Sequence, residues 1–194
     1  MESHTLQLLD ADVTYYPNFI LPEVALQQFT TLKEETPWQQ DAIKVFGKTY
    51  LQPRLTALYA NNNKPYSYSS LTMQPLAFTP TLLTIKNQVE QIIPVGFTTC
   101  LLNLYRDGND SNGWHADNEK ELGEHPIIAS VSLGASRLFH LKHRYQKDQK
   151  AKINLESGSL LLMKGLTQKY WLHQIPKTKK EVGPRINLTF RIIK

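Results

Sequence analysis

The sequence has one cysteine, Cys100, among its 194 residues. A lone cysteine excludes an internal disulfide, a cysteine-rich zinc site and an iron–sulfur cluster held by cysteines of this chain. Apolar runs are short, and none approaches the roughly 20 residues that a membrane-spanning helix needs. The first ten residues lack the basic segment and the long apolar segment of a secretory signal. We therefore expect an intracellular monomer without a membrane partner, cytoplasmic if the source is bacterial and nuclear if it is eukaryotic.

Acidic residues are outnumbered, with 17 Asp and Glu against 22 Lys and Arg, which gives a net charge of +5. Such a surplus is compatible with a polyanionic partner, although many basic proteins bind none. Much of the positive charge is gathered in residues 142–152 and 177–180. These stretches are candidates for contacts with phosphate groups, and solvated loops are an equally good interpretation.

The predicted elements change type along a chain whose length suits one compact domain. Helices are predicted only before residue 95: one begins at Pro22, and another begins at Pro80 behind a Thr79 cap and ends before Pro94. A series of antiparallel strands follows, which predicts a double-sheet jelly roll with helices outside it, an α+β fold. The strands are expected at residues 97–105, 127–133, 137–143, 152–155, 159–163 and 185–193.

A metal site is indicated by His115 and Asp117, which stand two residues apart. In an extended segment both side chains project from one face, as two neighbouring ligands of a single metal must. His173 is the best candidate for a third ligand, and two histidines with one carboxylate form the facial triad of non-haem iron(II) oxygenases. A surface His–Asp pair is the competing interpretation. The other histidines are expected in solvent: His4, His125, His140 and His143.

The last predicted strand alternates strictly between polar and apolar residues. If its polar face points into a barrel, the two arginines on it need anionic partners, and a dicarboxylic acid would satisfy both through forked hydrogen bonds. A solvent-facing edge strand would explain the pattern equally well. The polar face consists of Arg185, Asn187, Thr189 and Arg191, and a second polar pair, Asn103 and Tyr105, shares one face of an earlier strand.

The combined motifs resemble the signature of the AlkB family, iron(II)- and 2-oxoglutarate-dependent dioxygenases that repair alkylated bases. These motifs are Asn103-x-Tyr105, His115-x-Asp117, His173 and Arg185-x-Asn187-x-x-x-Arg191. The resemblance implies that His115, Asp117 and His173 hold Fe(II), with 2-oxoglutarate and oxygen as co-substrates. It implies that Arg185, helped by Tyr105 and Asn187, binds the distal carboxylate of 2-oxoglutarate. It also implies that Arg191, the fourth catalytic residue, lies with Asn103 beside the carboxylate next to the keto group.

The first half of the chain is similar to the branch of this family that works on double-stranded DNA. Val45-Phe46-Gly47-Lys48 is similar to a hairpin whose phenylalanine enters the duplex in place of the flipped base. An ordinary hairpin core residue is the other interpretation of Phe46. The chain departs from the pattern at Tyr68, where the family has phenylalanine, and at Asn118, where an acidic residue is usual. The resemblance implies that the substrate-binding residues are Phe46, Tyr66, Tyr68, Ser69 and Glu119.

The resemblance therefore implies one dioxygenase domain over residues 1–194. Residues 1–94 would form N-terminal helices and a nucleotide-recognition lid with its hairpin, and residues 95–194 the jelly-roll catalytic core. The implied function is oxidative demethylation of N1-methyladenine and N3-methylcytosine, preferably in duplex DNA by base flipping, with release of formaldehyde, succinate and CO2. Two alternatives stay open: the same chemistry on RNA or single-stranded DNA, and a catalytically silent nucleic-acid-binding jelly roll.

Overall fold

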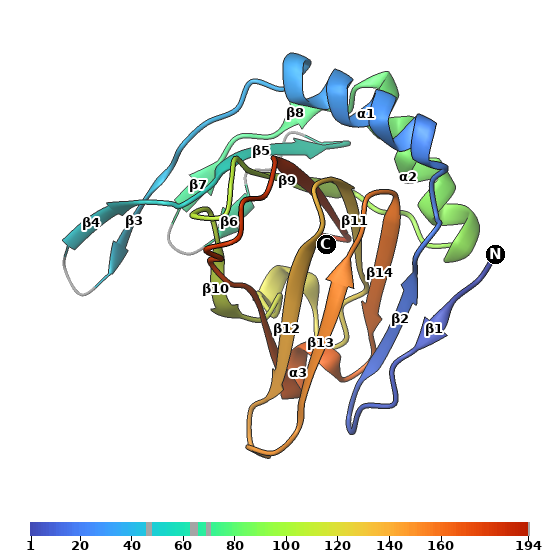
Figure 1. The fold of residues 1–194 in the computed structure, drawn as a ribbon, viewed down its shortest axis with the longest axis vertical. Coiled ribbons are helices and arrows are strands. Elements are labelled where there is room, and N and C mark those ends of the chain that lie inside the picture. The colour runs from blue at the N-terminus through green and yellow to red at the C-terminus, as the bar shows by residue number, and fades with distance from the viewer. Residues whose placement is uncertain (46–47, 63–65, 69–70, 194) are drawn as a thin grey trace.

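The computed structural model describes residues 1–45, 48–62, 66–68 and 71–193, and Figure 1 shows their arrangement. Two β-sheets form a jelly roll, and two helices cover the outer side of the larger sheet. The predicted α+β fold is confirmed. Within the described residues, every helix is too short or too polar to span a membrane. The helices are α1 (Pro22–Glu35), α2 (Pro80–Ile92) and the single turn α3 (Thr167–Tyr170), and a 3-10 turn spans Lys120–Leu122.

The larger sheet has eight strands, which come from both halves of the chain. Four of them precede residue 95, so this sheet extends across the boundary that the sequence predicts between lid and core. In spatial order the strands are β1 (His4–Thr5), β2 (Asp12–Tyr16), β14 (Ser159–Lys164), β11 (Ile128–Gly134), β16 (Arg185–Arg191), β9 (Thr99–Tyr105), β5 (Leu55–Ala60) and β8 (Leu76–Ala77).

The smaller sheet has four strands and carries two of the predicted metal ligands. Its order is β10 (Asn112–His115), β15 (Trp171–Ile175), β12 (Arg137–His143) and β13 (Lys150–Leu155). Two hairpins lie outside both sheets, and the first of them projects from the body of the molecule. They are formed by β3 (Ala42–Val45) with β4 (Lys48–Leu51), and by β6 (Tyr66–Tyr68) with β7 (Leu71–Met73).

Apolar side chains form separate clusters on the two sides of the larger sheet. The outer cluster joins the helices to the sheet and includes Ala25, Leu82, Val89, Leu102 and Leu188. The inner cluster joins the two sheets and includes Tyr105, Met163, Phe139 and Trp171. Because burial of apolar area is the main favourable term in folding, these two clusters fix the sheets and helices relative to each other. They leave the polar residues between the sheets in a rigid frame.

The six strands predicted after residue 95 are all present, with ends that differ by at most two residues. Helix α2 begins as predicted, because Thr79 Oγ1 accepts a hydrogen bond from the Leu82 backbone N–H at 3.3 Å. The expectation that helices occur only before residue 95 is wrong, since α3 forms a turn between β14 and β15. The sequence analysis also missed β10, β15 and the N-terminal strands of the larger sheet.

Strand β16 lies in the middle of the larger sheet, between β11 and β9. Every residue of β16 is buried, so the interpretation of its polar face as a solvent-facing edge is wrong. In the register with β9, Arg185 lies opposite Tyr105 and Asn187 lies opposite Asn103. The polar face of β16 and the Asn103–Tyr105 pair of β9, both noted in the sequence analysis, are therefore neighbours on one buried surface.

Candidate active site

A cavity lies between the two sheets, and every residue that the sequence analysis assigned to iron or 2-oxoglutarate lines it. Its free volume is about 40 Å³. The predicted residues in its wall are Asn103, Tyr105, His115, Asp117, His173, Arg185, Asn187 and Arg191, and the wall also contains Arg54, Asn112, Ser130, Phe139 and Thr189. Residues from several separate segments of the sequence thus meet in one small polar space.

The metal-ligand candidates converge as predicted. In the smaller sheet His115 of β10 pairs with His173 of β15, and Asp117 follows His115 by two residues. The ligand atoms of these three side chains lie within 4.8 Å of one another. In the part of the chain that the structure describes, this is the one group of His, Cys, Asp and Glu side chains close enough to share a metal ion. Two imidazoles and one carboxylate are a donor set that Fe(II) accepts.

The tautomer of His115 suits a metal ligand. Its Nδ1 lies 2.7 Å from the carbonyl oxygen of Gly113, to which only a protonated Nδ1 can donate a hydrogen bond. The Nε2 atom then keeps its lone pair, and the Asn112 Nδ2 amide lies 3.2 Å from it. A histidine that ligates a metal commonly donates its other ring N–H to a backbone carbonyl in this way.

His173 is 4% exposed, and its imidazole stacks on the Phe139 ring at a centroid distance of 5.1 Å. Burial lowers the pKa of His173 to about 3, and the His115 ring beside it acts in the same direction. The ring is therefore neutral at physiological pH, which is the form that binds metals.

Asp117 is 2% exposed and is held from two sides. Its backbone N–H donates to Oε1 of Gln168 at 2.9 Å, and its Oδ1 accepts a hydrogen bond from Nη2 of Arg191 at 2.8 Å. Burial raises the pKa of this carboxyl, but Arg191 and the two histidines more than offset it, so the pKa is lowered overall. The carboxylate is thus ionised and fixed in direction, as a metal ligand should be.

Arg185 has the features expected of an anion-binding residue. It is 1% exposed, and its Nη2 donates to Ser132 Oγ at 2.8 Å. Its Nε and Nη1 atoms are buried and find no hydrogen-bond partner among the described residues. No carboxylate in that part of the chain forms an ion pair with it. Burial lowers its pKa to about 10, partly countered by Tyr105 and reinforced by the Arg137 guanidinium. A bound carboxylate would satisfy both free N–H groups, so the residues fit a dicarboxylic acid.

Several residues that support this site were missed in the sequence analysis. Arg54 is 5% exposed and donates from Nε to Asn103 Oδ1 at 2.8 Å. Asn187 Nδ2 donates to Ser130 Oγ at 2.7 Å, and Gln168 anchors Asp117 as described above. These hydrogen bonds join residues between 49 and 57 positions apart, so no local sequence pattern predicts them. Nothing in the sequence around Arg54 indicated that its side chain is buried.

The predicted substrate-binding residues are placed only in part. Phe46 and Ser69 lie outside the described residues. Tyr66 and Tyr68 belong to β6, which pairs with β7, and Glu119 is half-buried two residues after Asp117. Val45 pairs with Lys48 at the end of the β3–β4 hairpin.

The predicted basic stretches lie on β12, β13 and the segment after β15. Lys142 and Lys150 pair across β12 and β13, and Lys142 Nζ lies 4.4 Å from the centroid of the exposed Trp114 ring. The expectation of a solvated His143 is wrong. It is 5% exposed, and its Nδ1 accepts hydrogen bonds from the backbone N–H groups of Tyr145 and Gln146.

Comparisons with known proteins agree with this geometry. The chain matches the 2OG-Fe(II) oxygenase superfamily over residues 12–191. It is 35% identical over 175 residues to "DNA oxidative demethylase ALKBH2" of Mus musculus, an alignment that covers 85% of this chain and 73% of the mouse protein. This chain belongs to the AlkB family of 2OG-Fe(II) oxygenases. The family uses Fe(II), 2-oxoglutarate and O2, and the predicted cofactors are confirmed at this level.

Relatives from a second AlkB group are also similar to the chain. "Alpha-ketoglutarate-dependent dioxygenase alkB homolog 3" of Bos taurus is 42% identical over 186 residues, covering 91% of this chain and 64% of the bovine protein. The chain therefore spans less than two thirds of that relative. A solved structure of OsALKBH1 superposes with a TM-score of 0.66 at 17% identity, covering 96% of this chain and 99% of that one. At this identity the superposition supports the AlkB-family fold.

Proposed function

We propose that this chain is an Fe(II)- and 2-oxoglutarate-dependent dioxygenase that oxidatively demethylates N-alkylated bases in DNA. The observation that carries the proposal is one cavity that contains both the His115–Asp117–His173 cluster and the buried Arg185, which has no carboxylate partner among the described residues. The ALKBH2 relatives are named DNA oxidative demethylases, which supports the substrate class. A silent binding module would have no need of this arrangement.

In this proposal His115, Asp117 and His173 hold Fe(II) through Nε2, a carboxylate oxygen and a ring nitrogen. Bound Fe(II) supplies the ability to activate O2 for attack on a C–H bond. Three protein ligands would leave the remaining coordination positions of Fe(II) to the co-substrates. Gln168 and Arg191 keep the Asp117 carboxylate in place through the hydrogen bonds described above.

The same proposal assigns 2-oxoglutarate to the polar face of β16. Arg185 would bind the distal carboxylate through its free Nε and Nη1, with Tyr105 and Asn187 beside it. Arg191 and Asn103 would lie near the carboxylate next to the keto group. Arg191 is a catalytic residue in this assignment because it would contact the co-substrate and already contacts Asp117.

For the nucleic acid, we propose that Tyr66, Tyr68, Ser69 and Glu119 contact the alkylated base. N1-methyladenine and N3-methylcytosine are cationic, so aromatic faces and a nearby carboxylate favour them over normal bases. The β3–β4 hairpin would insert Phe46 into duplex DNA where the base has flipped out. One oxygen atom of O2 enters succinate and the other enters the methyl group, which leaves as formaldehyde and restores the base. CO2 is released from the keto acid.

We further propose that residues 1–194 act as one domain and that the protein is a monomer. Its proposed location is inside the cell, where its DNA substrate is found. The lid and hairpins would belong to the same folding unit as the core, because β1, β2, β5 and β8 are strands of the larger sheet. Size measurement of the protein at increasing concentration tests the monomer. A dimer at micromolar concentration contradicts it.

The test is formaldehyde release from an oligonucleotide with a single N1-methyladenine, in matched duplex DNA, single-stranded DNA and RNA, with and without Fe(II). We expect release that needs Fe(II) and 2-oxoglutarate and is fastest on the duplex. Replacement of Phe46 by alanine should then slow the duplex reaction and spare the single strand. Equal loss on all strands, or faster release from RNA, contradicts the duplex proposal. No release from any strand contradicts the enzyme itself.

A further inference from the structure

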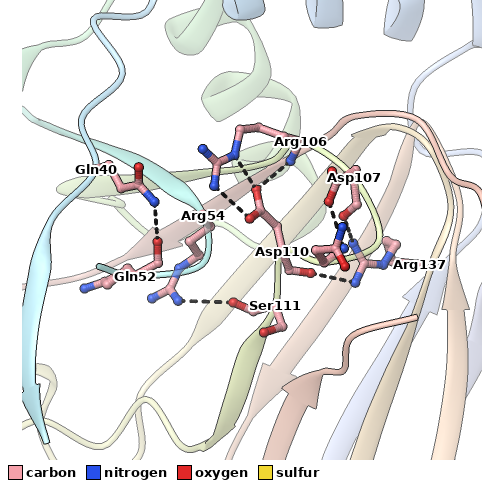
Figure 2. A network of polar contacts seen from close by, with 9 residues as sticks. Gln40, Gln52, Arg54, Arg106, Asp107, Asp110, Ser111 and Arg137 are labelled. Atoms are coloured by element: carbon pink, nitrogen blue, oxygen red, sulfur yellow. Dashed lines mark hydrogen bonds and ion pairs between the residues drawn. The ribbon is translucent and has the colours of Figure 1, made fainter. Parts of the chain in front are cut away.

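Arg137 stands outside the family motifs, yet it is one of the most enclosed charged residues of the protein. It opens β12, is 3% exposed, and donates three hydrogen bonds, all to backbone carbonyl oxygens. Nη1 donates to Asp107 at 3.0 Å, and Nη2 donates to Asp110 at 2.9 Å and to Pro176 at 2.7 Å. Figure 2 shows how the Asp107 and Asp110 carbonyls approach this guanidinium. Arg137 thus joins the loop after β9 to the segment after β15.

The fixed guanidinium of Arg137 also lies over the Tyr105 ring, at 5.6 Å from the ring centroid. The guanidinium of Arg185 lies over the same ring at 5.3 Å. Tyr105 is 2% exposed and lines the cavity, whereas Arg137 does not. Arg137 therefore contacts a residue of the cavity wall, Tyr105, without lining the cavity itself. A cation–π contact of this kind is stronger when the groups are desolvated.

Two buried guanidinium groups share one aromatic ring, and the hydrogen bonds of Arg137 go to neutral carbonyls. Their repulsion contributes to the lowered pKa of Arg185. A carboxylate bound beside Arg185 and Tyr105 would be attracted by both cations, because charges are screened weakly in a buried site of low dielectric. The arrangement suits an anion at this end of the cavity.

We propose that Arg137 is a positioning residue for the distal carboxylate of the dicarboxylate co-substrate, acting through the Tyr105 ring and its own charge. The inference rests on the proposed function and names a determinant of co-substrate specificity. Arg137 packs on the Tyr105 ring, over which Arg185 also lies, and adds positive potential there. The enzyme should therefore prefer a keto diacid over the keto monoacid of the same length partly because of Arg137.

The test measures dissociation constants of the Mn(II)-loaded protein, without O2, for 2-oxoglutarate and for 2-oxopentanoate, which has a methyl group where the distal carboxylate stands. We expect Arg137→Gln to weaken 2-oxoglutarate binding at least tenfold and to leave 2-oxopentanoate within twofold. Arg137→Lys keeps the charge without the planar fork, and its affinity for 2-oxoglutarate should fall by an amount between those of the wild type and Arg137→Gln. In turnover, Arg137→Gln should raise the KM for 2-oxoglutarate and keep kcat at saturation.

Arg106→Gln is the matched control. Arg106 donates to the Asp110 carboxylate from Nε at 2.8 Å and from Nη2 at 2.9 Å (Figure 2). Although Arg106 follows Tyr105 in the chain, the guanidinium groups that lie over the Tyr105 ring in the described residues are those of Arg137 and Arg185. We expect Arg106→Gln to bind both acids as the wild type does. The inference is overturned if both acids lose affinity together in Arg137→Gln, or if Arg106→Gln has the same selective loss. If Arg137→Gln does not fold, an unchanged diacid preference in Arg137→Lys overturns it. A wild type that does not bind 2-oxoglutarate contradicts the proposed function instead.

Discussion

Replacement of Arg185 by methionine should make the ligand-free protein more stable, although it removes the proposed co-substrate anchor. The charged guanidinium is buried without a carboxylate partner in the described chain, and burial lowers its pKa from the usual arginine value to about 10. At roughly 1.4 kcal/mol for each pH unit, the drop corresponds to about 3 kcal/mol of destabilisation. Methionine has a similar length and no charge, and replacing a buried charge by an apolar side chain of similar volume is often stabilising.

The substitution also has a cost, because the hydrogen bond from Arg185 Nη2 to Ser132 Oγ is lost. A bond of this kind contributes about 1 kcal/mol. The net expectation for Arg185→Met is a gain of about 2 kcal/mol, which corresponds to a rise in Tm of roughly 4–8 °C for a chain of this length. Thermal and urea unfolding of the metal-free and 2-oxoglutarate-free protein measures this difference.

When ligands are bound, the wild type should be more stable than Arg185→Met. With Mn(II) and 2-oxoglutarate at about 100 times the dissociation constant, the wild type should gain about 2.7 kcal/mol and Arg185→Met should gain none from the keto acid. Arg137→Met provides a contrast in the same assay, since it leaves three carbonyl oxygens without their donor and should destabilise the protein. If Arg185→Met is less stable than the wild type without ligands, Arg185 has a structural role and the reasoning is refuted.

Two further predictions concern the frame around the site. Gln168→Ala removes the acceptor for the Asp117 backbone N–H and should weaken Mn(II) binding about tenfold; unchanged affinity in a metal titration would show that Asp117 needs no such support. Gly134→Ala should destabilise the protein by about 3 kcal/mol in urea unfolding, because Gly134 has φ +87° and an added Cβ would lie 2.5 Å from the Pro184 carbonyl oxygen. Gly96→Ala, where a Cβ meets nothing within 4 Å, is its control, and equal losses in both variants would contradict the explanation.

The sequence predicts the metal ligands of the active site, but it does not predict the hydrogen bonds that support them. His115 and Asp117 are two positions apart, so their common direction follows from an extended backbone alone. The hydrogen bonds of Gln168 and Arg137 join segments 51 and 27 or more residues apart. Gln168 also lies in the single turn α3, which is shorter than any pattern of helical periodicity can reveal. Such contacts exist only after the two sheets have packed.

Strand β16 shows where periodicity stops being informative. Its alternation separates Arg185 and Arg191 from the apolar residues, but it is equally compatible with water or with a cavity on the polar side. The decision depends on β9 and β11, which pair with β16, and on the smaller sheet, which covers its polar face. A buried polar strand is costly unless its groups find partners, and Arg185 lacks two of them within the described chain. The sequence alone could not predict that the polar face of β16 is buried. Because it is buried, Arg185 needs an anionic partner, which supports an anionic co-substrate.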